Sequence, residues 1–327
     1  MKDTASKPEI SFVVPVFNEE GTIKLLFAQI RDIMEGDVQK AFEILFVDDG
    51  SSDASWREIS DLTDANQNVV GIRLKKNFGK ADALNAGFQW AKGKILITMD
   101  ADLQDDPREV PRFLEKLEAE FDMVVGWKKW RNDPWSKTVP SKVFNRITAL
   151  VSGVKLKDFN CGFKAGTKEA FGSIKLYGEL HRYIPVLCHH AGFRVGQISV
   201  THHPRQHGKS KYGFERYVRG FLDLLTVISL TRYAKRPGHL FGGIGVVSGL
   251  FGVAILVYLA GLKLFFDEII GNRPLLLLGV MLVLMAVQFL LFGILAELNL
   301  SQNHAQSQKP IVHEIKSGSD NSDAETL

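Results

Sequence analysis

The sequence contains few cysteines: Cys161 and Cys188 are the two among 327 residues. Two thiols cannot form the framework of several disulfides that holds small secreted domains together. This composition therefore excludes the disulfide-rich secreted class and fits a protein that folds in a reducing compartment.

A large net charge is also missing. The chain has 40 Lys and Arg residues against 37 Asp and Glu residues, a formal net charge of +3. A chain so balanced lacks the overall basic surface with which proteins bind nucleic acid without sequence preference. We therefore expect no nucleic-acid partner, and the basic residues between Lys128 and Arg236 matter locally instead.

Long hydrophobic runs are absent near the N-terminus. The apolar run there covers 10–17, is interrupted by Pro15, and is followed by Asn18, Glu19 and Glu20. It is too short for a spanning helix and lacks a small-residue cleavage site. We therefore interpret it as a buried first strand rather than as a signal peptide.

Short apolar runs rich in Val, Ile and Phe alternate with stretches of helical pattern. The runs cover 10–16, 42–47, 69–74, 95–99 and 123–125, and the helical stretches cover about 19–35, 54–65, 80–92 and 107–119. This alternation predicts an α/β fold whose parallel sheet is covered on both faces. Ligands of such sheets bind beyond the carboxyl ends of the strands, where polar clusters follow three of the runs.

Two long charge-free stretches occupy the last third of the chain. The first, 240–262, has 23 residues and reaches about 34 Å as a helix, enough for a hydrocarbon core of about 30 Å. The second covers 275–296, with Pro274 at a position that tolerates proline in a helix start. The sequence therefore predicts two transmembrane helices.

The residues around the first span suggest further contacts. Apolar residues recur at helical spacing over 212–233 beside basic residues, which is typical of a helix in a membrane interface or of a surface helix packed on the core. Small residues suit close helix–helix contact, either within the hairpin or with a second copy of the chain, and they are Gly238, Gly242, Gly245 and Gly249.

These features predict four parts: an N-terminal domain over 1–210, interfacial helices over 211–236, two transmembrane helices over 237–300 and a disordered tail over 301–327. Basic residues before the first span outnumber those in the connecting loop, and no signal sequence precedes the large first domain. Both observations favour a cytoplasmic N-terminal domain and tail in a multi-pass membrane protein.

Two acidic motifs follow predicted strands. Asp100 and Asp102 follow the run 95–99, and paired carboxylates there suit Mg²⁺ or Mn²⁺, which bind one or two carboxylates together with a substrate diphosphate. Asp48 follows the run 42–47 and can accept hydrogen bonds from a base or a ribose hydroxyl. The alternative roles are a solvated loop for the first motif and a cap of the next helix for the second.

Four sequence blocks in this order resemble the signature of the family 2 inverting glycosyltransferases with a GT-A fold. They are VVPVFNEE at 13–20, VDDGSSD at 47–53, NFGK at 77–80 and DADLQDDP at 100–107. More narrowly, they are similar to the polyprenyl-phosphate branch, which includes bactoprenol glucosyltransferases and dolichol-phosphate mannose synthases. The resemblance covers about 8–235, and the two-helix C-terminal anchor matches the bacterial members.

The resemblance implies a site for a nucleotide-sugar and a divalent metal, Mg²⁺ or Mn²⁺. The implied nucleotide-sugar contacts are Pro15, Phe17, Glu19, Asp48, Asp100, Ala101, Asp102 and Gln104, of which Asp100, Asp102 and Gln104 hold the metal. Asp158 matches a family aspartate near the reacting centre and would orient the acceptor or act as a base.

The acceptor implied by the resemblance is a lipid phosphate. The resemblance places this phosphate at Lys128, Lys137, Ser141 and Arg205, and the local charge adds Lys209, Ser210 and Lys211. An alternative role for Lys209 and Lys211 is attraction of anionic lipid headgroups. A phosphate monoester loses its second proton near pH ~6, so it is already a nucleophile at neutral pH.

The sequence thus predicts inverting transfer of one hexose to polyprenyl (undecaprenyl) phosphate at the cytoplasmic leaflet of the inner (plasma) membrane. Glucose from UDP-glucose is the expected donor, and mannose from GDP-mannose is the alternative. The pattern Gln-x-x-Arg-Trp of processive synthases is absent, the nearest segment being 179–183, which favours transfer of a single sugar. A membrane assembly subunit without activity is the alternative from another class, and the intact acidic motifs argue against it.

Overall fold

The computed structural model describes residues 7–129, 145–150, 152–201, 203, 226, 237–267, 269, 271 and 274–304. The chain separates into two compact units, Met1–Arg232 and Tyr233–Leu327, and we describe each by itself.

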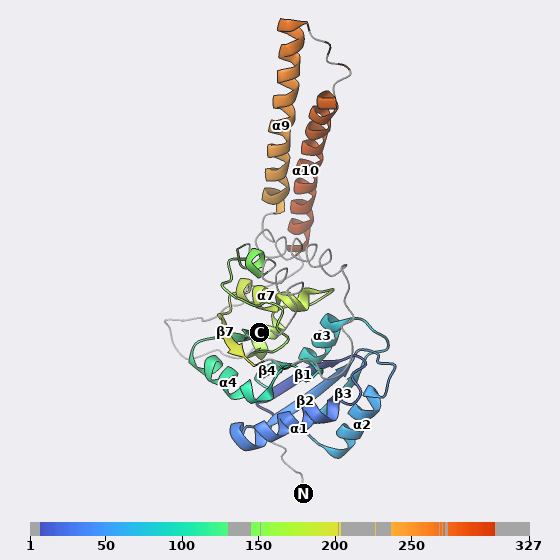
Figure 1. Cartoon of the computed structure of the whole chain (residues 1–327), viewed down its shortest axis with the longest axis vertical. Helices are drawn as coiled ribbons and strands as arrows, with labels where there is room; N and C mark the ends of the chain where they lie inside the picture. The colour runs from blue at the N-terminus through green and yellow to red at the C-terminus, as the bar shows by residue number, and fades with distance from the viewer. Residues whose placement is uncertain are drawn as a thin grey trace, which may run out of the picture. The chain divides into compact units, whose positions relative to one another are not determined.

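The first unit is built on a seven-stranded sheet with the order β3-β2-β1-β4-β6-β5-β7 (Figure 1). The strands are β1 Ile10–Val16, β2 Phe42–Asp48, β3 Val69–Arg73, β4 Ile95–Thr98, β5 Met123–Lys128, β6 Lys164–Thr167 and β7 Val195–Val200. Neighbouring strands are parallel except around β6, which runs antiparallel to both β4 and β5. The predicted α/β fold with a mostly parallel sheet is confirmed.

Helices cover both faces of this sheet. They are α1 Ile23–Ile33, α2 Ser55–Ala65, α3 Lys80–Trp90, α4 Val110–Ala119, α6 Lys168–Gly172 and α7 Ile184–His190, with a π-helical turn Met34–Val38 and 3₁₀ turns η2 Pro107–Glu109 and η3 Leu180–Tyr183. α1 packs beside α2, and α3 packs beside α6. The connections through α1 and α2 cross the sheet in one direction, and the connection through α3 crosses it in the opposite direction. Because crossovers are right-handed, α3 must lie on the face of the sheet opposite to α1 and α2.

The burial of the strands follows from the sequence pattern. In β1 every residue except Pro15 is buried, and β2 is almost as completely covered, as expected for continuous apolar runs between two helical layers. β7 alternates between buried and half-buried residues, which suits its place at the edge of the sheet. The helix α1 contributes Ile23, Phe27 and Ile30 to the core at helical spacing.

The strand order places a ligand crevice beside β1. From β1 the chain moves outward to β2 and β3, and it then returns to the other side of β1 to form β4. Because β1 and β4 are adjacent and parallel, the loops that follow them lie side by side at the carboxyl edge of the sheet. Such a reversal of strand order is where α/β sheets bind ligands.

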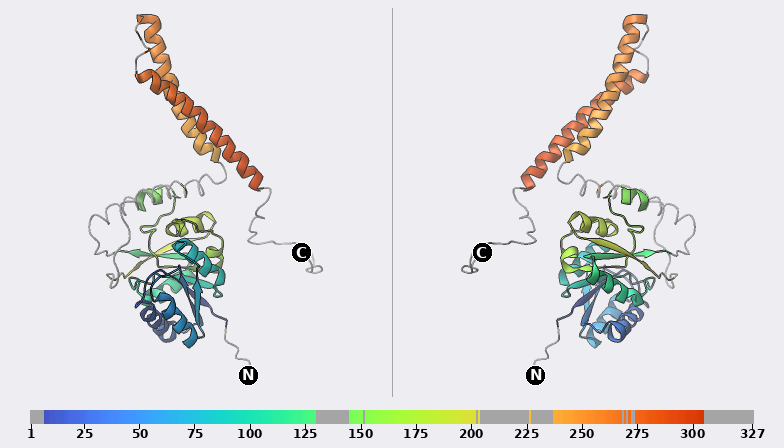
Figure 2. Two further views of the ribbon diagram at one scale, coloured as in Figure 1. Left: turned by 90° about the vertical axis from the view of Figure 1, so that its right-hand side faces the viewer. Right: turned by 90° about the vertical axis from the view of Figure 1, so that its left-hand side faces the viewer.

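The second unit is a hairpin of two long helices, α9 Pro237–Phe266 and α10 Pro274–His304, which lie against each other in both views of Figure 2. The segments Gly238–Phe266 and Pro274–Asn299 are long and apolar enough to cross a membrane. Both predicted spans thus coincide with helices, and the pair forms a membrane anchor by length and composition. The predicted interfacial segment 211–236 and the tail 301–327 fall almost wholly outside the described residues.

Glycines of α9 bring the two helices close together. A β-carbon added at Gly245 would lie 2.9 Å from the Ala286 carbonyl oxygen, and one added at Gly249 would lie 3.2 Å from the Ala286 β-carbon. These glycines are therefore used for contact with α10 within one chain. Contact with a second copy of the chain stays a prediction.

Candidate functional site

The loops after β1 and β2 are fastened to each other. The Asn18 backbone N–H donates to Ser51 Oγ at 2.9 Å, and Asn18 Oδ1 accepts a hydrogen bond from the Ser52 N–H at 2.8 Å. The Glu19 N–H donates to Ser55 Oγ at 2.9 Å, and Asn18 adopts a left-handed φ of 53° that turns the chain sharply. The serines after β2 thus hold the first loop in place beside the crevice.

The two adjacent aspartates at the end of β2 have different surroundings. Asp48 is fully buried, its Oδ2 lies 3.2 Å from Arg73 Nε, and its Oδ1 accepts the Ser51 N–H. Asp49 instead faces the crevice and accepts the N–H groups of Phe78 and Gly79 at 2.8 and 2.9 Å. Burial raises the pKa of Asp49 despite these hydrogen bonds. The structure therefore brings Asp49, and not the predicted Asp48, to the wall of the crevice.

The loop after β4 carries Asp100 and Asp102. Lys80, the first residue of α3, forms an ion pair with Asp100. Burial acts against both charges, yet their mutual attraction outweighs it, raising the pKa of Lys80 and holding the pKa of Asp100 well below its ordinary range. Asp102 Oδ1 accepts the backbone N–H of Gln104 at 3.2 Å. Asp100 is thus charged at neutral pH, and both carboxylates are held in place by neighbouring groups.

These three loops enclose one wide cleft of about 400 Å³. Its wall contains most of the predicted nucleotide-sugar contacts, namely Pro15, Phe17, Glu19, Asp100, Ala101 and Asp102, together with Asp49, Asn77, Gly79, Lys80, Glu179 and His181. Asp48 and Gln104 do not line it. The Gln104 side chain points elsewhere, its Nε2 donating to the His203 carbonyl oxygen at 3.4 Å.

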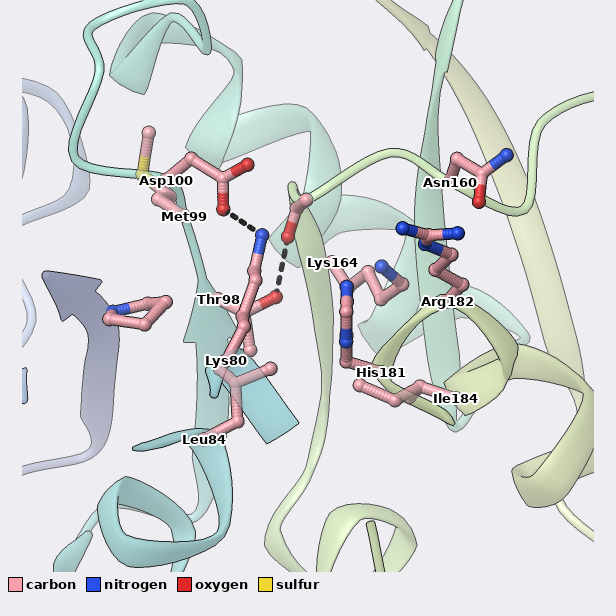
Figure 3. Close-up of a pocket in the computed structure, with 12 residues that line it drawn as sticks. Lys80, Leu84, Thr98, Met99, Asp100, Asn160, Lys164, His181, Arg182 and Ile184 are labelled. Atoms are coloured by element: carbon pink, nitrogen blue, oxygen red, sulfur yellow. Dashed lines mark hydrogen bonds and ion pairs between the residues drawn. The ribbon is translucent and has the colours of Figure 1, made fainter. Parts of the chain in front are cut away.

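A smaller pocket of about 150 Å³ adjoins the wide cleft, and we call it the cationic pocket. The two spaces share Pro15, Lys80, Asp100 and His181. The rest of the pocket is lined by Leu84, Thr98, Met99, Asn160, Gly162, Lys164, Arg182 and Ile184. In Figure 3, Lys164, His181 and Arg182 stand on one side of this pocket, across from Asp100.

Positive charge dominates the cationic pocket. Lys164 is 3% exposed, and its Nζ donates to the Cys161 carbonyl oxygen. Burial lowers the pKa of Lys164 to about 8. Arg182 forms an ion pair with Glu179 at 2.6 Å. Burial also lowers the pKa of His181 well below its ordinary value, so its imidazole is neutral at neutral pH.

The residues of the wide cleft fit a divalent cation that is shared with a substrate. Within the described parts of the chain, no three His, Cys, Asp or Glu side chains are grouped so that they could hold a metal ion. Mg²⁺ and Mn²⁺ characteristically use one or two carboxylates and complete their shell with phosphate oxygens and water. Asp100 and Asp102, which share one wall of the cleft, supply such a pair.

Two residues predicted for catalysis or the acceptor already have partners in the protein. Lys128 Nζ lies 3.2 Å from Oδ1 of the buried Asp105, whose charge keeps the pKa of Lys128 above its ordinary value although burial works to lower it. Asp158 is 1% exposed, accepts the Asn160 N–H at 3.1 Å, and lines neither the cleft nor the pocket. The other predicted acceptor residues, Lys137, Ser141, Arg205, Lys209, Ser210 and Lys211, lie outside the described residues.

Several residues at the site were not selected from the sequence. Lys80 belongs to the NFGK block. Its position at the start of a helix that follows a strand could have identified it as a site residue. Glu179, His181 and Arg182 line the site and belong to segment 179–183, whose sequence departs from the processive pattern and carries no other sign of a binding role. Lys164 opens β6, a strand that the hydrophobic pattern does not indicate.

Comparison with known proteins gives the family. Residues 11–174 match the family described as glycosyl transferase family 2. Dodecaprenyl-phosphate galacturonate synthase from Rhizobium johnstonii is 40% identical over 303 residues, covering 90% of this chain and 89% of that protein.

Solved structures share the fold at low identity. Glucosyl-3-phosphoglycerate synthase from Mycobacterium tuberculosis, in complex with Mn²⁺ and UDP-glucose, matches with a TM-score of 0.53 and 20% identity over 68% of this chain and 79% of that chain. Its complex with phosphoglyceric acid matches with a TM-score of 0.51 and 17% identity over 68% and 79% of the two chains. These matches confirm the GT-A type of sheet. The chain therefore belongs to glycosyl transferase family 2 and is a glycosyltransferase.

Proposed function

We propose that the protein transfers one sugar from a nucleoside diphosphate donor to polyprenyl phosphate, with inversion at the anomeric carbon. The observation that carries this proposal is the convergence of Pro15, Phe17 and Glu19 with Asp100 and Asp102 in one cleft at the strand reversal. The similarity to a dodecaprenyl-phosphate galacturonate synthase over nine-tenths of the chain supports the lipid phosphate as acceptor.

In this proposal the donor lies along the wide cleft. The base and ribose bind between the loops after β1 and β2, where Phe17 offers an aromatic face and Asp49 a carboxylate. The diphosphate then reaches the end of the cleft that holds Asp100, Asp102 and Lys80. The Lys80 ammonium is well placed to leave Asp100 and bind a phosphate oxygen as the donor enters.

Asp100 and Asp102 would hold Mg²⁺ or Mn²⁺ when the donor is bound. Such an ion supplies charge neutralisation for the departing nucleoside diphosphate. The sequence-based role of Gln104 as a third ligand requires its side chain to turn from the His203 carbonyl toward the cleft. Its backbone N–H already orients Asp102 by donating to Oδ1.

The reaction with a lipid phosphate requires correct placement of the acceptor more than a residue that removes a proton from it. A lipid phosphate is a nucleophile at neutral pH, so the chain must place it opposite the leaving group and shield the like charges. The hairpin of α9 and α10 would keep the enzyme at the inner membrane, with the active site at the cytoplasmic leaflet where the lipid phosphate is reached.

Glucose was the expected sugar, whereas the galacturonate synthase acts on an acidic one.

A direct test compares two acceptors. Vesicles that carry the full chain receive labelled UDP-sugars, Mg²⁺ or Mn²⁺, and either undecaprenyl phosphate or undecaprenol. We expect label in the lipid fraction with the phosphate and at least about a hundredfold less with the alcohol, because a hydroxyl proton near pKa ~16, as in water, needs a base to remove it. EDTA should abolish the transfer. Equal labelling of both lipids, or release of free sugar only, would exclude a phosphate acceptor.

A further inference from the structure

The buried ammonium of Lys164 calls for an explanation. Within the described residues its Nζ has one hydrogen-bond partner, the Cys161 carbonyl oxygen, and forms no ion pair with a carboxylate. A buried charge that no carboxylate contacts directly lowers stability, and a ligand that brings an opposite charge into contact with it would remove this cost. Lys164 also lines the cationic pocket, which gives a ligand access to it.

Arg182 strengthens the case for an anionic ligand. It is 9% exposed, lines the same pocket, and its NH2 pairs with Glu179. A guanidinium has five N–H donors in a planar fork, so one ion pair leaves donors that match a second carboxylate. Lys80, Lys164 and Arg182 together give the pocket lining three cations against the single carboxylate of Asp100.

The size and place of the pocket indicate which part of the donor it receives. Its volume of about 150 Å³, against about 400 Å³ for the wide cleft, suits a single sugar ring rather than a whole nucleotide. It adjoins the wide cleft at Asp100, the end where the proposed function puts the diphosphate. Since the sugar is bonded to that diphosphate, the pocket is the adjoining space into which the sugar extends.

We propose that the cationic pocket binds the C6 carboxylate of a hexuronic acid, and that Lys164 and Arg182 make the enzyme prefer an acidic donor sugar over a neutral hexose. The inference rests on the proposed function, because it places the donor diphosphate in the wide cleft. A neutral hexose would bring a hydroxymethyl group to the same position and leave the Lys164 ammonium without a carboxylate in direct contact. This assignment replaces glucose with a hexuronate as the transferred sugar.

The test uses donor pairs that differ only at C6: UDP-galacturonate against UDP-galactose, and UDP-glucuronate against UDP-glucose. The full chain in vesicles with undecaprenyl phosphate is compared with Lys164→Met and Arg182→Gln. We expect the wild type to prefer a uronate, and each variant to lower the uronate-to-hexose ratio of kcat/KM by about ten- to a hundredfold. The kcat/KM for the uronate should fall more than the kcat/KM for the neutral sugar, because only the uronate loses a charge-assisted contact. Arg194→Gln, which removes an exposed ion pair with Asp122, is the matched control and should leave the ratio unchanged.

Other results separate the possible roles of these cations. An unchanged ratio overturns the proposal, and so does an equal loss with both members of a pair, which would assign the cations to the diphosphate. A raised KM for undecaprenyl phosphate with an unchanged ratio also overturns it and assigns the pocket to the acceptor. If Arg182→Gln does not fold, Lys164→Met decides alone, since removing a buried charge should not lower the melting temperature. No transfer by the wild type from any donor would instead overturn the proposed function itself.

Discussion

Replacing Asp102 by Asn is expected to lower the metal-dependent kcat by at least about a hundredfold while the protein stays folded. The amide keeps the shape of the side chain, and its oxygen can still accept the Gln104 N–H that Asp102 Oδ1 accepts. What is lost is one negative charge on the cleft wall, and with it most of the attraction for Mg²⁺ or Mn²⁺ beside the diphosphate. The measurement is kcat over a metal titration, with thermal unfolding to confirm the fold.

Asp122→Asn is the matched control for this change. Asp122 is an acidic residue outside the cleft, paired with the exposed Arg194, so its amide variant should keep the wild-type kcat. If the Asp102 variant turns over at a nearly normal rate while EDTA still inhibits the wild type, Asp102 does not bind the metal.

Gly162→Ala should be almost as damaging, with an expected fall in kcat/KM of about a hundredfold. A β-carbon added at Gly162 would lie 2.6 Å from Asp100 Oδ2 and 2.7 Å from Asp100 Cγ, closer than such atoms can approach. The segment cannot simply withdraw, because Thr98 Oγ1 donates to the Gly162 carbonyl oxygen at 2.7 Å. The Asp100 carboxylate must therefore move away from Lys80 and from the position in which it would face the metal.

The control for that prediction is Gly172→Ala at the end of α6, where an added β-carbon meets nothing within 4 Å. It should leave kcat/KM and the melting temperature unchanged. A fully active Gly162→Ala enzyme would show that the position of Asp100 is not critical. A variant that loses activity only together with its fold would make Gly162 a structural residue.

The parts of the fold that the sequence predicted are those whose residues are uniformly apolar. The strands β1 to β5 appear as runs of Val, Ile and Phe because both faces of the sheet are covered, and α9 and α10 appear as charge-free stretches. The strand β6 could not be found this way, since Lys164–Thr167 contains a lysine and a glycine. It belongs to the sheet because its backbone pairs with both β4 and β5.

The candidate site shows the same division. The acidic pair Asp100 and Asp102 could be placed because it directly follows a recognisable strand. The sequence could not show whether Asp48 or Asp49 faces the crevice. Successive side chains at the end of a strand point to opposite sides, so a shift of one position changes which carboxylate lines the cleft. Lys164 comes from β6 and Arg182 from η3, and no local sequence pattern indicates that both line one pocket.

The central claim is that one sugar passes from a nucleoside diphosphate to polyprenyl phosphate, and mass spectrometry of the lipid product tests it most directly. The purified full chain is incubated in vesicles with undecaprenyl phosphate, a UDP-hexuronate and Mg²⁺ or Mn²⁺, and the lipids are extracted. The predicted result is undecaprenyl phosphate heavier by one sugar residue, with no longer products and with release of UDP in equal amount. Unmodified lipid beside free sugar, or a ladder of successive additions, would contradict the account.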